Sequence, residues 1–257
     1  MVMNGVKRVC IFVDGENLRH NIVDLFPPPV FYQSSYLPKT DWAKFFDWIT
    51  SEVAGKQAER VRAYWYVVQS IDYAPANLNA VCHDKEILIR LIKKSPDFSE
   101  KFNAMVDHAE HETILHEFAD FLYENRRSMQ GRFDGWTSVQ NGIAQNCASV
   151  EFRRAGSIRY DLLRRNLGFE KAVDVKLATD LIKLKDIYDV AIIVSGDQDY
   201  VPAVDTIKDY GKHVVNVAFL TSENNLLPGG ARRLNQATDS SFLISHTDLA
   251  VHLGFNV

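Results

Sequence analysis

The stretch from Ile187 to Phe219, IYDVAIIVSGDQDYVPAVDTIKDYGKHVVNVAF, constrains the fold more than any other part of the chain. Val190–Val194 is short, apolar and rich in β-branched residues, which favours a buried strand over a helix. A helix is expected over 200–210, with Pro202 in its first turn, and a second buried strand over 214–219. Strand, loop, helix and strand form a βαβ unit of a parallel sheet, where ligands bind beyond the carboxyl ends of the strands.

Acidic residues stand at the predicted carboxyl ends of two strands. Asp197 and Asp199 follow Val190–Val194, and Asp14 closes the short apolar run over 6–13. The carboxyl ends of neighbouring parallel strands meet at one edge of a sheet. We therefore expect these two acidic loops to face each other.

A further acid is expected at the same edge. Within residues 169–184, an apolar stripe from Val173 to Leu184 recurs at helical spacing and predicts a helix that begins at Asp174 and leads directly into the strand Val190–Val194. Asp174 stands near the start of that helix, where the helix dipole alone favours an acid. Because the helix immediately precedes the strand, its N-terminus should lie at the edge that carries Asp14 and Asp197.

Carboxylates brought together from separate strand ends raise one another's pKa, so a cation is the simplest way to offset their repulsion. Magnesium or manganese prefers oxygen ligands, and Asn17 and the Ser195 hydroxyl are suitable neutral helpers. Zinc is not expected, because neither cysteine nor histidine falls in these loops. A cation held in this way can activate water and stabilise charge on a phosphodiester, which predicts metal-dependent hydrolysis of that bond.

The remaining segments predict one domain over residues 1–257 with a helical insertion. Residues 42–53 show helical spacing of their aromatic side chains, and residues 61–68 alternate as a second strand. From about 77 to 147 the pattern is helical, and this segment is longer than an ordinary crossover between parallel strands. A third strand is expected from Ser149 toward Arg159.

The formal net charge of −4 excludes a generally basic surface, so a nucleic-acid partner would need a local patch. A basic stretch near the third strand fits such a patch as a phosphate-contacting rim, although scattered surface charge explains it equally well. It comprises Arg153, Arg154, Arg159, Arg164, Arg165, Lys171 and Lys176.

Other features of the sequence narrow the class of protein. Three widely spaced cysteines without zinc or CxxC spacing indicate a reducing, cytoplasmic setting. Apolar runs fall short of the roughly 20 residues that span a bilayer, so no membrane partner is expected. The sequence also lacks GxxxxGK[ST], GxGxxG and GxSxG, the signatures of competing α/β enzymes.

Three blocks carry a family resemblance: FVDGENL at 12–18, EKAVDVKLATDLI at 170–182 and VSGDQDYVPAVDTIKDYGKHV at 194–214. In order and spacing they resemble the NYN domain family, the LabA-like branch of the PIN-like nuclease superfamily. The resemblance implies a three-layer α/β/α, Rossmannoid fold with a parallel sheet. The helical insertion predicted between strands 2 and 3, over about 77–147, has no counterpart in the minimal domain of this family. It also implies an acidic metal site that many relatives use as a ribonuclease.

The resemblance extends to single residues. Asp14 and Asn17 match the acid and the amide of the first block, and Asp174 matches the acid of the second. Asp197 and Asp199 match the pair in the third block, with Ser195 beside them.

Three further positions complete the comparison with the family pattern. Asp180 matches a recurrent family acid, but its helical spacing could turn it away from the metal, so it ranks second. Ala172 stands where the family commonly has glycine, and Tyr200 where it often has phenylalanine. Neither departure removes a ligand.

The leading hypothesis is a ribonuclease that holds Mg²⁺ or Mn²⁺ with Asp14, Asp174, Asp197 and Asp199. Asn17 and Ser195 would orient ligands or water. RNA would be guided by Arg153, Arg154, Arg164, Arg165, Lys171 and Lys176. A non-catalytic or weakly active RNA-binding or regulatory scaffold of the same fold is the alternative, and a DNA-directed nuclease a third. The number of metal ions and a homo-oligomer are left open.

Overall fold

The computed structural model describes residues 5–32, 35–104, 107–227 and 231–256. The chain divides into two compact units. The first consists of Met1–Val67, Ser138–Ala155 and Ala172–Val257, and the second of Val68–Thr137 and Gly156–Lys171. Strands β2 and β3 and helix α6 contribute residues to both units.

A mostly parallel sheet forms the centre of the first unit. Its parallel strands are, in spatial order, β2 (Glu59–Ala74), β1 (Arg8–Asp14), β5 (Val190–Val194), β6 (His213–Leu220) and β8 (Ser240–Ile244). A short β7 (Leu226–Leu227) pairs antiparallel with β6. β1 and β5 are buried almost throughout, which agrees with their unbroken apolar sequences.

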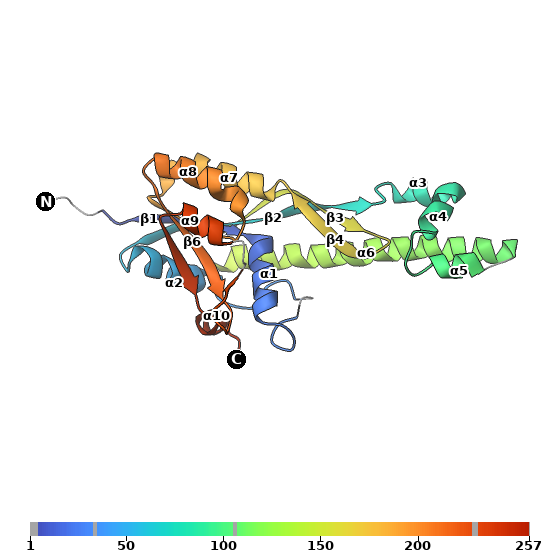
Figure 1. Ribbon diagram of the computed structural model, residues 1–257, viewed down its shortest axis with the longest axis horizontal. Helices are drawn as coiled ribbons and strands as arrows, with labels where there is room; N and C mark the ends of the chain where they lie inside the picture. The colour runs from blue at the N-terminus through green and yellow to red at the C-terminus, as the bar shows by residue number, and fades with distance from the viewer. Residues whose placement is uncertain (1–4, 33–34, 105–106, 228–230, 257) are drawn as a thin grey trace. The chain divides into compact units, whose positions relative to one another are not determined.

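Helices cover both faces of this sheet. Figure 1 shows α7 (Val173–Lys183) and α8 (Val201–Asp209) on one side and α2 (Trp42–Ala54) on the other. Alternation along β2 explains the two layers: the Tyr66 hydroxyl reaches α7, whereas the Trp65 ring packs against aromatic rings of α2. The predicted three-layer α/β/α fold is confirmed.

The remaining helices of the first unit flank the sheet. They are α1 (Gly15–Leu25), α9 (Ala231–Ala237), α10 (His246–Leu253) and the 3₁₀ turns η1 (Lys185–Ile187) and η2 (Gln198–Tyr200). α1 follows β1 without a loop, and η2 leads into α8. Both therefore begin at the carboxyl edge of the sheet.

The second unit holds the helices that follow β2 and an antiparallel hairpin. The helices are α3 (Leu78–His83), α4 (Lys85–Ile92), α5 (Ser99–Ala104) and most of α6 (His108–Asn146). The hairpin joins the end of β3 (Val150–Asp161) to β4 (Asn166–Lys171), and β3 also neighbours the end of β2. The helices lie between β2 and β3 in the chain, as the predicted insertion requires.

The strand β4 was not predicted from the sequence. Phe169 and Lys171 belong to it, whereas α7 starts at Val173, next to the start predicted at Asp174. Lys171 pairs with Ser157 across the hairpin, so contacts with a distant segment decide its conformation. Arg165, at a φ of +55°, turns the chain between the two strands.

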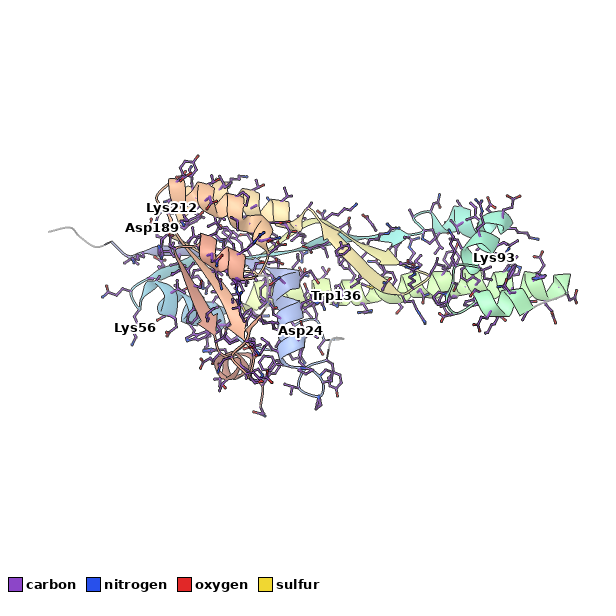
Figure 2. All side chains as sticks on the ribbon, viewed as in Figure 1. Asp24, Lys56, Lys93, Trp136, Asp189 and Lys212 are labelled. Carbon is purple, nitrogen blue, oxygen red and sulfur yellow. The ribbon has the colours of Figure 1, made fainter. Side chains whose placement is uncertain are left out.

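An ion pair lies at the end of the sheet opposite the acidic loops. Arg8 donates to both carboxylate oxygens of Asp189, which is labelled in Figure 2, at 2.9 and 3.2 Å. Arg8 lowers the pKa of Asp189 to about 2, chiefly through these hydrogen bonds. Across the described ranges, none of the helices is both long and apolar enough to cross a membrane.

Substitution of Gly15 tests how closely the junction between β1 and α1 packs against β2. A Cβ at this position would lie 2.4 Å from the Tyr66 carbonyl oxygen and 2.8 Å from Val67 Cγ1. We expect Gly15→Ala to lower the free energy of unfolding by about 3 kcal/mol, because backbone must shift to relieve the clash. Urea denaturation measures the change.

Gly142→Ala is the matched control. Gly142 lies in α6, and the place that an alanine methyl group would take there has no other heavy atom within 4 Å. Alanine should therefore stabilise the helix by up to about 1 kcal/mol. If Gly15→Ala were as stable as the wild type, Gly15 would not lie as close to Tyr66 and Val67 of β2 as the structure places it.

Candidate acidic site

The Asp14 carboxylate lies at the carboxyl end of β1 and is only 4% exposed. Its Oδ1 accepts the Asn17 backbone N–H at 3.1 Å, which caps α1. Its Oδ2 accepts hydroxyl hydrogen bonds from Ser195 at 2.8 Å and Tyr200 at 3.3 Å. The donors to this buried carboxylate are neutral, so they leave its charge uncompensated.

Ser195 and Asn17 join the two acidic loops that the sequence places at this edge. The Ser195 hydroxyl donates to Asp14 and also accepts the Asp197 N–H at 3.0 Å. The Asn17 side-chain oxygen accepts the Gly196 N–H at 3.1 Å and an Asn21 side-chain N–H at 3.0 Å. Both residues therefore position the loop that follows β5.

Asp174 reaches the site through Tyr200. The carboxylate is in the first turn of α7, and its Oδ1 accepts the Tyr200 hydroxyl at 2.8 Å. That hydroxyl also lies 3.3 Å from Asp14 Oδ2, so it bridges acids from two elements. Sequence reasoning singled out Tyr200 only as a departure from the family pattern. The sequence shows a phenol directly after Asp199, but it does not show what the hydroxyl contacts.

Asp197 and Asp199 differ in their surroundings. Asp197 is half-buried, and its Oδ1 accepts the Asp199 N–H at 2.9 Å, which caps η2. Asp199 is exposed and lines two surface pockets, one of about 450 Å³ shared with Asp174 and one of about 730 Å³ shared with Arg233. Asp14, Asp174 and Asp197 thus form the inner part of the site, with Asp199 at its mouth.

Burial, together with the charge of neighbouring acids, raises the affinity of Asp14 and Asp197 for protons. Burial raises the pKa of Asp14 to about 6, and the charges of Asp174 and Asp197 add to this effect. The pKa of Asp197 is also raised, first by burial and then by the charges of Asp199 and Asp174. Burial raises the pKa of the Tyr200 phenol far above its usual value, so it stays protonated and can donate.

Asp180 lies in a different environment. It is fully buried; its Oδ2 accepts from Arg153 at 2.6 Å and from the Tyr66 hydroxyl at 3.2 Å, and its Oδ1 accepts from Lys176 at 3.0 Å. Burial opposes ionisation, but the two cations prevail and lower the pKa of Asp180. This acid joins α7 to the sheet through ion pairs inside the first unit.

The predicted RNA-binding cations divide between the two units. In the first unit, Arg153 and Lys176 pair with Asp180, and Arg154 donates to Gln140 and Asn141. The second unit holds Arg164, Arg165 and Lys171; Arg165 forms an ion pair with Asp97, whereas Lys171 is exposed beside a pocket.

The acidic residues at the carboxyl edge decide whether the site suits a metal ion. Within the described ranges, no three acidic, histidine or cysteine side chains are grouped closely enough to hold an ion as they stand. The donor set nevertheless suits a hard cation, because Asp14, Asp174 and Asp197 offer carboxylate oxygens at one edge. The raised pKa values of Asp14 and Asp197 mark a place where positive charge would be stabilised.

Comparison with known proteins identifies the family to which the chain belongs. The family model described as NYN domain matches residues 109–244, slightly more than half of the chain. The chain belongs to the NYN domain family. This family lies within the PIN-like nucleases, while the LabA-like branch stays a prediction. The matched NYN region includes Asp174 and the loop after β5, whereas Asp14 precedes it.

Among solved structures, a protein of unknown function from Vibrio parahaemolyticus RIMD 2210633 is similar to this NYN protein. It matches with a TM-score of 0.44 and 17% identity, covering 95% of this chain and 96% of that one. Among curated proteins, none matches.

Asp14→Asn tests the uncompensated charge. In metal-free buffer at pH 7 to 8, we expect the variant to gain up to about 3 kcal/mol in free energy of unfolding over the wild type, because a neutral amide avoids the cost of the buried carboxylate. Thermal and urea denaturation measure the difference.

The dependence of stability on pH is a second test of the buried Asp14 charge. The folded state binds the Asp14 proton more tightly than the unfolded state, whose pKa is near 3.8, so wild-type stability falls from about pH 4 to about pH 6. The advantage of Asp14→Asn should grow over that window and then level off. Asp24→Asn, at an exposed position on α1 labelled in Figure 2, should change stability by less than about 0.5 kcal/mol. If Asp14→Asn were less stable than the wild type, the buried charge of Asp14 would not be what destabilises the folded protein.

Asp180→Ala should have the opposite effect. Removing this acid leaves Arg153 and Lys176 without their buried partner, so we expect a loss of about 3 kcal/mol. Asp205→Ala, at an exposed position of α8, should change stability little. If Asp180→Ala instead weakened Mn²⁺ binding in calorimetry while leaving stability unchanged, Asp180 would belong to the metal site.

Proposed function

We propose that this NYN protein is a metal-dependent ribonuclease that hydrolyses RNA phosphodiester bonds at the acidic site. The buried Asp14 carboxylate, with its raised pKa beside Asp174 and Asp197, carries the proposal. Burying this charge without a cationic partner costs stability, and a neutral residue such as asparagine could cap α1 in its place. Membership of a nuclease superfamily supplies the reaction class, and the carboxylates supply the donors.

In this proposal Asp14, Asp174, Asp197 and Asp199 hold Mg²⁺ or Mn²⁺. The bound ion supplies Lewis acidity toward the phosphodiester and lowers the pKa of water. Ser195 and Asn17 keep the loop after β5 against Asp14, so the acids stay at fixed positions. Asp199 is exposed at the mouth, where the scissile phosphate would approach.

A specific observation supports a second candidate, a weakly active RNA-binding scaffold. The Tyr200 hydroxyl lies within hydrogen-bond distance of both Asp14 and Asp174, so its one proton is shared between the two carboxylates and holds them together without a cation. A phenylalanine at this position would leave the two carboxylates facing each other without that donor. The two candidate functions differ in whether the acidic site cleaves the RNA that the protein binds.

Cleavage of labelled RNA separates them. We expect the purified chain to cut a mixed-sequence RNA with Mg²⁺ or Mn²⁺ but not with EDTA, and to cut the matching DNA less. Asp14→Asn and Asp174→Asn should each lower the rate on the order of 100-fold or more, because several kcal/mol of charge stabilisation depend on the bound ion. Single-turnover assays on denaturing gels measure the rate.

Asp24→Asn, purified in parallel, is the matched control and should retain the wild-type rate. Equal cleavage by Asp14→Asn, or cleavage that persists in EDTA, would show that the site does not perform the reaction. RNA binding without cleavage in either metal would favour the scaffold.

A further inference from the structure

The second unit carries an aromatic ring that is not packed into its core. Phe169, in β4, is 92% exposed, although phenylalanine is usually buried. Among the described residues of this unit, other large apolar side chains are not exposed to a comparable degree. A single bare ring is too small for a protein-docking patch, which needs a contiguous apolar area.

The ring lies on a polar and basic sheet face. Ser157 pairs with Lys171 across the hairpin, so these side chains share one face of the sheet. Phe169 lies two residues before Lys171 on the same strand, at a register shift between the pairs Ile158–Glu170 and Tyr160–Leu167, so the pocket that the two residues share places them on one side. Arg159 and Lys171 are both exposed.

A pocket confirms that these side chains converge. Its volume is about 530 Å³, and it is formed entirely by residues of the second unit. Phe169, Arg159, Lys171, Ser157 and Asp72 all line it. The Ser157 hydroxyl donates to Asp72 at 2.5 Å, so the pocket also holds an oriented carboxylate.

We propose that this hairpin face, defined by Phe169, Arg159, Lys171, Ser157 and Asp72, binds a single-stranded RNA segment, with one base stacked on Phe169. Every base has a π face, so stacking on an exposed ring recognises single strands with little sequence preference. Arg159 and Lys171 carry the charge that phosphates need. Asp72 accepts hydrogen bonds from N–H groups on a base edge, which a phosphate cannot offer.

This inference rests on the proposed function only in taking RNA as the polymer. The acidic site belongs to the first unit and the hairpin face to the second, so binding and cleavage can be lost separately. The hairpin face would hold substrate independently of metal.

The test is binding of a fluorescein-labelled mixed-sequence 12-mer RNA to the full chain in EDTA, followed by anisotropy. We expect Phe169→Ala to weaken binding about 5- to 100-fold and Phe169→Leu to weaken it similarly, whereas Phe169→Trp retains it. Arg159→Gln combined with Lys171→Gln should reduce the slope of log affinity against log salt by about 1.4. Circular dichroism melts confirm folding, and Phe169 is exposed enough for substitution to leave stability intact.

Tyr210→Ala is the matched control. Tyr210 is another exposed aromatic residue, 56% accessible, with Lys185 Nζ 5.0 Å from its ring, and it belongs to the first unit. Its removal should leave RNA binding unchanged.

Binding by Phe169→Ala within about twofold of the wild type would overturn the inference. So would full retention by Phe169→Leu, since leucine keeps apolar surface but not stacking. If RNA binding is unchanged while Phe169→Ala dissociates a dimer in sedimentation, the face belongs to a second copy of the chain, and the inference fails.

The two proposals fail in different ways. Metal-dependent cleavage abolished by Asp14→Asn, together with unchanged binding by Phe169→Ala, would keep the nuclease and reject the hairpin face. Phe169-dependent binding without cleavage would keep the hairpin face and reject the nuclease.

Discussion

The burial of one carboxylate, Asp14, organises the carboxyl edge of the sheet. β1 delivers it between β2 and β5, and α1 starts at the next residue, so chain on every side must come close. Gly15 permits that approach, because a side chain there would meet the Tyr66 carbonyl. Ser195 and Asn17 then tie the loop after β5 to the same carboxylate. The position of the other acids follows from this attachment.

Asp14 and Asp180 are both buried, but the groups around them shift their pKa values in opposite directions. Asp180 receives two cations and a phenol, so its charge is balanced within the protein and its pKa is lowered. Asp14 receives an amide and two hydroxyls, none of which carries charge, and its pKa is raised. A balanced acid stabilises a structure, whereas an unbalanced one is free to take a cation or a proton. This contrast separates a packing role from a chemical one more clearly than spacing within a helix could.

Sequence reasoning succeeded where a segment determines its own conformation. Val190–Val194 is buried on both faces and is therefore apolar throughout, which makes it recognisable without knowledge of its neighbours. β4 has the sequence NLGFEK, with glycine and polar residues, and it is a strand because it pairs with β3. Lys176 is an i, i+4 partner of Asp180 on α7, but Tyr66 and Arg153 lie on β2 and β3, so helical spacing alone could show only part of the balance of its charge. Asp14, Asp174 and Asp197 could be expected at one edge from topology, but the phenol joining two of them could not.

The two departures from the family pattern act on the same acid. Ala172 adopts a left-handed φ of +73° directly before α7, a conformation that glycine adopts freely and alanine only at a cost of about 1 kcal/mol. Two residues later, Asp174 accepts the hydroxyl of Tyr200, which a phenylalanine would lack. The strain at Ala172 is sustained because the start of α7 is held from the other side by that hydrogen bond and by burial of Val173. In this chain, then, the Tyr200 phenol helps to fix Asp174 beside Asp14.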